Sequence, residues 1–466
     1  MRGALAPRGD GDAGVVAPPA PAPASSRLAA AVRRLARLAS ATSGGGSPTA
    51  TRRSASRARA VVVGGMILDI QARPDASRAL IRGSSTPGVV RQTPGGVGRN
   101  VAEGVARLRP PGAPAPLLVS VVGDDPAGAA LRAHWVRDVA ASDAAIRVAS
   151  DAATPVVSAV LEPGGEVYAA VADVRSAERA LPPEWVRRFR DDVRDAAVLV
   201  LDANCAGETL RCAAELAKGP PGKEAGLEGW FRRPRGARRP IVWFEPVSVA
   251  KSTRASDAGI LAACDWISPN VAELRAMAKR ARAQTRDGFA LAGRGGEHSH
   301  SGGERSASAD ESFASAREAA AATAADVAAT LDAGVGRVAL TLGALGALLC
   351  ERGDPGDPGD PGDPGDPGDG TSVIVAFTHV PAVPVRRAVS LVGAGDAFVA
   401  GCVAALCAGR PPTAAAAAGS AAAKRAVETE ANVAAGEGGG LEALEADAEG
   451  VMRGVTRWRV RVDRGG

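Results

Sequence analysis

The stretch "SLVGAGDAF" at residues 390–398 comes just before a long apolar run, and this pattern predicts a glycine-rich turn that opens a helix. Gly393, Ala394 and Gly395 would leave backbone N–H groups unobstructed at the helix N-terminus, where the helix dipole favours an anion. Asp396 lies in the first turn. It can cap the helix, or it can act as a base beside a phosphoryl group held by those N–H groups. Because capping requires no glycines next to the carboxylate, we favour the second interpretation.

A second glycine-rich segment, "TPGGVGRNVAEGVARL" at residues 93–108, also predicts a turn followed by a helix. Its apolar positions recur at helical spacing. A small residue such as Gly96 lets the backbone approach a ligand closely, and Asn100 can hydrogen-bond a hydroxyl from the first helical turn. A tight strand-to-helix turn without a ligand explains the same residues, so this segment alone does not decide between a structural and a binding role.

The two commonest phosphate-binding loops are absent from the sequence. The pattern GxxxxGK[ST] could be anchored only on Gly222 and Lys223, but Ala217 stands at its first glycine and Glu224 at its Ser/Thr. The pattern GxGxxG fails at "GGVGRNV" because Val101 occupies its last glycine. These mismatches argue against a P-loop protein and against a dinucleotide dehydrogenase.

Composition narrows the class of protein further. The chain has 466 residues, enough for one large α/β domain or two ordinary ones, and aromatic residues make up only 3%, so alanine and valine must fill most of the core. No apolar run approaches the ~18 residues that span a bilayer, so we expect a soluble protein without a membrane partner. The six cysteines form no CxxC pair and the four histidines are scattered, which favours reduced core thiols over a metal cluster.

Positive charge is concentrated at the N-terminus. Residues 1–60 hold ten arginines and two aspartates, so the remainder is slightly acidic although the net charge is +5. The basic segment at residues 231–239 lacks interleaved aromatic residues and predicts a solvated loop rather than a nucleic-acid contact. Residues 1–58 are typical either of an organellar transit peptide, mitochondrial or plastid, or of a disordered tail on a cytoplasmic protein. A peroxisomal signal fits less well, because Arg34 stands where that signal needs His or Gln.

Strand-like and helix-like segments alternate from residue 59 onward. "RAVVVGGMILDI" at residues 59–70 predicts a buried first strand, and "TPVVSAVLEPGGEVYAAVAD" at residues 154–173 predicts a hairpin. Further strands are expected at residues 116–123, 196–203, 240–246, 264–270, 337–351 and 372–380, with a helix at residues 126–139 and others between most strands. Repeated βα units predict an α/β fold with a mostly parallel sheet and helices on both faces.

Three low-complexity insertions interrupt this domain, which we place at residues 59–440. They are a Pro/Gly/Arg-rich segment at residues 219–239, a Gly/Ser/His-rich segment at residues 284–312, and tandem Asp-Pro-Gly triplets at residues 354–370. The acidic triplets suggest calcium, but proline at every third position favours a solvated spacer in an expanded hairpin loop. Residues 441–466 form a C-terminal extension.

Four motifs together carry a resemblance to a known family. "GGVGRN" at residues 95–100 and "GAGDAF" at residues 393–398, in this order and about 300 residues apart, are similar to the two signatures of the ribokinase-like (PfkB) carbohydrate kinases. "SPNVAEL" at residues 268–274 resembles the family's NxxE motif, and "LTLGALGA" at residues 340–347 resembles its nucleotide-site strand and turn. Within the family the sequence is most similar to pseudouridine kinases, above all in "FEPVSVAKS" at residues 244–252.

This resemblance implies a ribokinase-like three-layer sandwich with a small β-lid made from residues 70–93 and 154–173. It also implies phosphorylation of pseudouridine at its 5′-hydroxyl by ATP with Mg²⁺, giving pseudouridine 5′-phosphate and ADP. One alternative is a sibling kinase for another nucleoside or for ribose or fructose, and another is a non-catalytic nucleotide- or sugar-binding regulator. Whether the chain forms a homodimer stays open.

The resemblance further implies a role for each motif residue. Asp396 would deprotonate the 5′-hydroxyl, beside an anion hole made by the N–H groups of Gly393, Ala394 and Gly395. The ribose hydroxyls would be held by Asp69, Asn100 and the Gly96 backbone. At the nucleotide end, Asn270, Thr341 and Gly343 would bind ATP, and Glu273 would act on Mg²⁺ through a metal-bound water.

The sequence departs from the family pattern in two places. Ser390 and Leu391 stand where many members carry Asp-Thr, a pair associated with a monovalent-cation site, so dependence on such a cation stays open. Ile67 stands where many relatives have Asn, close to Asp69, and this change bears on the contacts with the sugar.

Overall fold

The computed structural model describes residues 59–463 except 76, 79, 82, 163–166, 220–238, 288–311, 354–371, 430–432 and 434–439. The chain divides into two units, Met1–Arg53 and Ser54–Gly466, and all described residues belong to the second. The predicted targeting segment or tail at residues 1–58 and nearly all of the three predicted insertions therefore lie outside the described residues.

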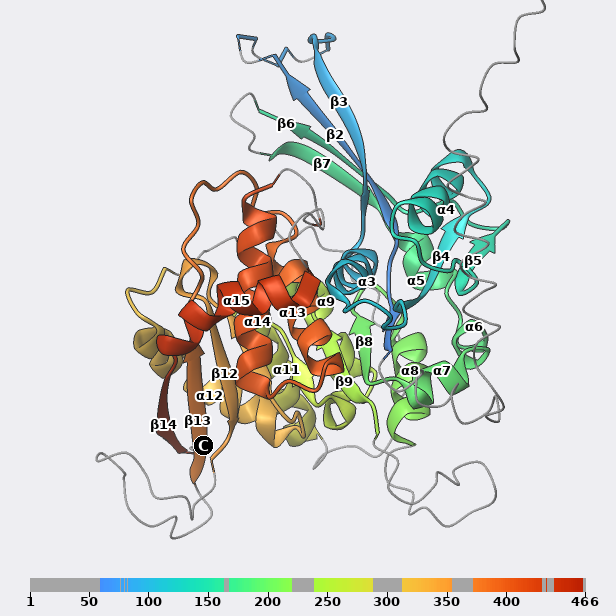
Figure 1. Cartoon of the computed structure of the whole chain (residues 1–466). Coiled ribbons are helices and arrows are strands. Elements are labelled where there is room, and N and C mark those ends of the chain that lie inside the picture. Colours follow the sequence, from blue (N-terminus) through green and yellow to red (C-terminus); the bar gives the residue numbers. More distant parts are fainter. Residues whose placement is uncertain are drawn as a thin grey trace, which may run out of the picture. The chain divides into compact units, whose positions relative to one another are not determined.

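A ten-stranded sheet forms the centre of the second unit (Figure 1). From one edge to the other its strands are β5 (Ile146–Ala149), β4 (Leu117–Gly123), β1 (Ala60–Val63), β8 (Val198–Asp202), β9 (Ile241–Glu245), β10 (Trp266–Ile267), β11 (Val338–Thr341), β12 (Ala347–Arg352), β13 (Ser372–Val380) and β14 (Thr456–Asp463). Neighbouring strands pair in parallel from β5 to β11 and antiparallel from β11 to β14. The predicted hairpin around the Asp-Pro-Gly triplets is thus present as β12 and β13.

Helices cover both faces of this sheet, because alternate strand residues point to opposite sides. In β1, Val61 and Val63 belong to one hydrophobic core, whereas Ala60 and Val62 belong to the other. The first core is closed by α6 (Pro183–Arg187), α7 (Arg190–Asp195), α8 (Gly207–Lys218), α11 (Val271–Asp287) and α12 (Ala316–Asp332). The second is closed by α3 (Val97–Leu108), α4 (Pro126–Arg137), α13 (Ala394–Cys407), α14 (Pro412–Val427) and α15 (Gly440–Arg453). The predicted three-layer α/β arrangement is confirmed.

Short helices join the remaining elements. They are α5 (Arg175–Arg179), α9 (Val249–Ser252), α10 (Arg254–Asp257) and the single 3-10 turns η1 (Leu261–Ala263) and η2 (Gly343–Leu345). All six cysteines carry free thiols, five of them buried, as expected for reduced core residues. Among the described helices, none is both long and apolar enough to cross a bilayer.

Four strands form a second, smaller sheet in the order β3 (Gly88–Gly95), β2 (Ile67–Pro74), β6 (Val156–Leu161) and β7 (Val167–Asp173), seen at the top of Figure 1. β6 and β7 are antiparallel, so the hairpin predicted at residues 154–173 is confirmed. β2 pairs antiparallel with β3 and parallel with β6. This sheet is much less buried than the large one, and Val90 and Val171 are 66% and 73% exposed.

The predicted first strand at residues 59–70 is two strands in different sheets, so that prediction was wrong. The chain leaves β1 at Gly64 and enters β2 at Ile67. Gly65 donates its N–H to the Asp202 carboxylate at the end of β8, over 2.8 Å. A Cβ atom on Gly64 would lie only 2.7 Å from the Gly98 Cα. The apolar pattern continues through the break because β1 is fully buried and β2 is half-buried, and only the glycine pair marks it.

Candidate active site

The N-terminus of α13 is open, as the glycine-rich pattern predicts. Gly393 precedes the helix with φ of 80°, a left-handed conformation that glycine adopts without strain. A Cβ atom on Gly395 would meet no other atom within 4 Å. No side chain of the described residues caps this helix. The Gly395 backbone therefore faces accessible space, which is the geometry of an anion site, whereas the Ala394 N–H donates to the Leu391 carbonyl over 3.3 Å.

Asp396 does not cap its own helix. Its Oδ2 atom accepts a hydrogen bond of 2.6 Å from Nδ2 of Asn100, which lies on α3 nearly 300 residues earlier in the chain. Asp396 is half-buried, and the partial removal of its carboxylate from water raises its pKa to about 7, although the Asn100 hydrogen bond acts in the opposite direction. A carboxylate with this pKa can both accept and release a proton near neutral pH.

Asp396 and Gly395 line a cavity of about 200 Å³ together with three other predicted residues, Asn270, Glu273 and Thr341. The remaining lining residues are Val97, Glu245, Val247, Ser268 and Val399. Several of them follow the carboxyl ends of the parallel strands β9, β10 and β11. Ligands of open α/β sheets bind at this edge. Of the predicted catalytic, nucleotide and metal residues, five are thus brought to one cavity: Gly395, Asp396, Asn270, Glu273 and Thr341.

Asn270 and Glu273 form a reciprocal cap at the start of α11. The Glu273 N–H donates to Asn270 Oδ1 and the Asn270 N–H donates to Glu273 Oε2, both over 2.9 Å. The NxxE spacing is therefore a capping box in this chain. Thr341 is fixed beside it, because its N–H donates to the Pro269 carbonyl over 2.9 Å. Burial raises the pKa of Glu273, and its bond from the Asn270 N–H opposes that rise.

Glu245 is a site residue to which the sequence analysis gave no role. Its Oε2 accepts a hydrogen bond from the hydroxyl of Ser268, which itself accepts one of 2.7 Å from the Trp243 indole. Burial raises the pKa of Glu245 well above its usual range, and the nearby charges of Glu273 and Asp396 add to that rise. One signal could have revealed it: an acidic residue ends the otherwise apolar strand "IVWFE".

The predicted substrate residues approach Asp396 from the other side. Asn100 contacts it directly, and the charge of Asp69 raises the Asp396 pKa. Gly96 has φ of 91°, and a Cβ atom there would lie 2.5 Å from the Gly65 carbonyl oxygen, so close packing alone requires this glycine. Gly343 is not among the residues lining the cavity, nor are Gly393 and Ala394.

The donors present fit a magnesium ion that arrives with phosphate. Among the described residues, no group of three His, Cys, Asp or Glu side chains is close enough to hold a metal by itself. Magnesium is usually held by one or two carboxylates together with water and substrate phosphates. Glu273 and Glu245 in one cavity beside an open helix N-terminus supply that kind of incomplete site.

Comparison with known proteins identifies the family. The model of the pfkB family carbohydrate kinases matches residues 57–298 and 305–434. The chain belongs to this family. As a pfkB carbohydrate kinase it transfers phosphate from ATP to a hydroxyl group of a small molecule, a nucleoside or a sugar.

Two curated relatives carry the same name. This pfkB kinase is 32% identical over 416 residues to the pseudouridine kinase of Arabidopsis thaliana, a match that covers 85% of this chain and 97% of that protein. It is 28% identical over 234 residues to the pseudouridine kinase of Escherichia coli strain K12, covering 50% of this chain and 62% of that protein.

Solved structures confirm the ribokinase-like fold. The ribokinase of Arabidopsis thaliana, complexed with ribose and ATP, superposes with a TM-score of 0.55 at 16% identity, covering 85% of this chain and 98% of that one. A carbohydrate kinase from Agrobacterium tumefaciens superposes with a TM-score of 0.57 at 21% identity, covering 86% and 99%. At sequence identities of 16% and 21%, the similarity to these two structures shows the fold alone.

Proposed function

We propose that this kinase phosphorylates pseudouridine at its 5′-hydroxyl, giving pseudouridine 5′-phosphate and ADP. The observation that carries the proposal is Asp396, a half-buried carboxylate beside the open N-terminus of α13, with its pKa raised to about 7. The 32% identity to the Arabidopsis pseudouridine kinase, across 97% of that protein, supports the choice of nucleoside.

Asp396 acts as the general base. It accepts the proton of the 5′-hydroxyl while that oxygen forms a bond to the γ-phosphorus of ATP, and the bond from this phosphorus to the oxygen bridging it to ADP breaks. The backbone N–H groups of Gly393, Ala394 and Gly395 stabilise the negative charge on the transferred group. No side chain in the described part of the chain caps α13, which supports this assignment because a cap would compete with the phosphoryl group.

Asn270 and Thr341, which line the cavity, bind the nucleotide there, and the Gly343 turn binds it outside the cavity lining. Magnesium, when bound with ATP, neutralises part of the phosphate charge. The capping bond at the start of α11 uses Oε2 of Glu273, which leaves Oε1 to accept a hydrogen bond from a metal-bound water.

The sugar end is formed by Asp69, Asn100 and the Gly96 backbone, which bind ribose hydroxyls. Asp69 lies in β2 of the small sheet, so the sheet that supplies this sugar-binding residue can also cover the sugar. Covering the sugar in this way excludes water from the transferred phosphoryl group and limits ATP hydrolysis.

A coupled ADP-release assay on the full chain tests the substrate. Pseudouridine, uridine, adenosine, ribose and fructose are compared at equal concentration with ATP and Mg²⁺, and Asp396→Asn is assayed in parallel to exclude a contaminating kinase. We expect kcat/KM for pseudouridine to exceed that for each other compound by roughly tenfold or more. Turnover of ribose without turnover of pseudouridine would overturn the proposal.

A further inference from the structure

A buried ion pair lies directly behind the proposed base. Arg99 and Glu103 face each other one turn apart on α3, with side chains only 3% and 2% exposed and 2.5 Å between Nη1 and Oε2. Removing both charges from water is costly, and such pairs often add no net stability. The position of this pair, one residue from Asn100, therefore suggests a task other than stability.

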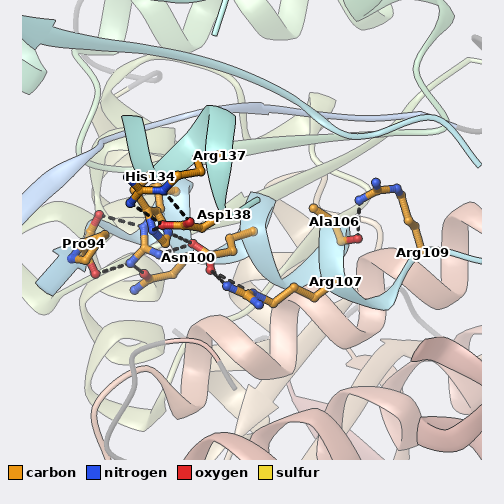
Figure 2. Close-up of polar contacts among 11 residues, drawn as sticks. Pro94, Asn100, Ala106, Arg107, Arg109, His134, Arg137 and Asp138 are labelled. Atoms are coloured by element: carbon orange, nitrogen blue, oxygen red, sulfur yellow. Dashed lines mark hydrogen bonds and ion pairs between the residues drawn. The ribbon is translucent and has the colours of Figure 1, made fainter. Parts of the chain in front are cut away.

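The Arg99 guanidinium connects three parts of the site, and two of its partners, Pro94 and Asn100, are labelled in Figure 2. Its Nη2 donates to Oδ1 of Asn100 and to the carbonyl oxygen of Pro94, and its Nε donates to the carbonyl oxygen of Gly95 over 3.3 Å. Pro94 and Gly95 end β3 of the small sheet. One cation thus holds together the end of that sheet, the Asn100 amide and Glu103.

Glu103 is held independently of Arg99. Its Oε1 accepts a hydrogen bond of 2.8 Å from Arg107 Nε, and its Oε2 lies 2.9 Å from Nε2 of His134 on α4. Figure 2 labels two of these side chains, Arg107 on α3 and His134 on α4. Although burial opposes it, hydrogen bonding from His134 and the charge of Arg99 lower the Glu103 pKa to about 2. Glu103 therefore remains an anion at working pH and keeps its partner cationic.

We propose that Arg99 is a positioning residue that orients the Asn100 amide and thereby holds Asp396 as the ionised proton acceptor. A guanidinium can only donate hydrogen bonds, so the Asn100 oxygen must face Arg99. The amide nitrogen then faces Asp396, and its 2.6 Å bond requires an acceptor there, which the ionised carboxylate supplies. Without Arg99 the amide can turn and accept a hydrogen bond from protonated Asp396.

Carboxylates around Asp396 oppose its ionisation, so the orientation of the Asn100 amide affects its protonation state. Asp202 at the end of β8 and Asp69 in β2 raise its pKa. Glu245 at the end of β9 is a further carboxylate that interacts with Asp396. Opposing them are the Asn100 hydrogen bond and the positive charge of Arg99, both from α3. Groups on α3 thus stabilise the ionised form of Asp396, whereas carboxylates on three strands destabilise it.

The test is the pH dependence of kcat/KM for pseudouridine in the full-length Arg99→Met variant, measured beside the wild type from pH 5.5 to 9. We expect the acid limb, the part of the profile where kcat/KM rises with pH, to shift to higher pH by about one unit. The variant's kcat/KM is then roughly tenfold below that of the wild type at pH 6.5, and the two become equal near pH 9. The matched control is Arg107→Met, which removes another arginine from Glu103 but has no contact with Asn100; its acid limb stays at the wild-type position.

A wild-type acid limb in Arg99→Met, or an equal loss at every pH, would overturn the inference. If Arg99→Met does not fold, as judged by thermal melting, Glu103→Gln carries the test. This variant keeps an acceptor for Arg99 but removes the negative charge that offsets it, so the acid limb is expected to move to lower pH, and an unchanged limb contradicts the inference. The inference rests on the proposed function. If the wild type is inactive on every nucleoside and sugar, the proposed function is refuted. If the wild type is active and Arg99→Met has the same pH profile, only the role of Arg99 is refuted.

Discussion

The two glycine-rich helix starts of this kinase look alike in sequence but differ in what lies in front of them. At α3, the Gly98 N–H donates to the Asp202 carboxylate over 2.9 Å, and a Cβ atom on Gly98 would lie 2.6 Å from the Gly64 Cα. At α13, a Cβ atom on Gly395 would meet nothing within 4 Å, and no described side chain caps the helix. The first helix start is closed by the protein itself, and the second is left open.

This difference separates two uses of glycine. At α3 the glycines allow backbone segments to touch, and the buried Asp202 carboxylate accepts hydrogen bonds from the Gly98 N–H of the helix and from the Gly65 N–H between β1 and β2. At α13 the glycines keep space clear for an external anion. The same residue type therefore serves packing in one place and binding in the other, and substitutions at the two places have different consequences.

The largest effect is expected from Asp396→Asn, which removes the base from the open helix start. Asparagine keeps an acceptor for Asn100 but cannot take up the hydroxyl proton. We expect kcat for pseudouridine to fall by about 10³-fold or more, with ATP affinity within about twofold of the wild type. Turnover is measured by ADP release and ATP affinity by calorimetry; near-normal turnover would remove Asp396 from its assigned role.

The comparison is tested most sharply by adding one methyl group at each helix start. Gly395→Ala places the methyl in the open space, so kcat should fall roughly tenfold to a hundredfold while the melting temperature stays the same or rises, since alanine favours the helix. Gly98→Ala places it against the Gly64 backbone and should reduce the free energy of unfolding by about 1–3 kcal/mol. Thermal melting and kcat are measured for both variants, and equal stability losses would erase the distinction.

A smaller effect concerns stability and pH. The pKa of Asp396 is about 7 in the folded protein against an ordinary value of 3.8, so the folded state binds the extra proton between these values. Ionising the half-buried carboxylate therefore costs stability as pH rises from about 4 to 7, and the full cost is present above 7. Asp396→Asn removes this cost. Its melting temperature should exceed that of the wild type by more at pH 8 than at pH 5, and a difference independent of pH would argue against a half-buried carboxylate.

Local patterns predicted much of the fold. The β-branched strands, the hairpin at residues 154–173 and both glycine-rich helix starts were expected, because each depends on neighbours in the chain. The break between β1 and β2 was missed, since Asp202, which holds it, lies nearly 140 residues away.

The site was predictable only where a motif marks it. Gly395 and Asp396 of "GAGD" and Asn270 and Glu273 of "NxxE" line one cavity, and their catalytic roles stay predictions. The capping box at the start of α11 could have been recognised from its spacing. Glu245 and Arg99 were not given roles. Their importance depends on contacts with Ser268 and Asn100 and on burial by distant elements, and no local pattern encodes those contacts.

The central claim is that a half-buried Asp396 beside the open end of α13 removes the substrate proton. Its most direct test is the pH dependence of kcat/KM for pseudouridine in the wild-type enzyme between pH 5 and 9, with MgATP saturating. A base of this kind gives a rate that rises about tenfold per pH unit on the acid side and levels off near pH 7, the pKa of the folded carboxylate. A rate that is constant from pH 5 to pH 8 would contradict the account.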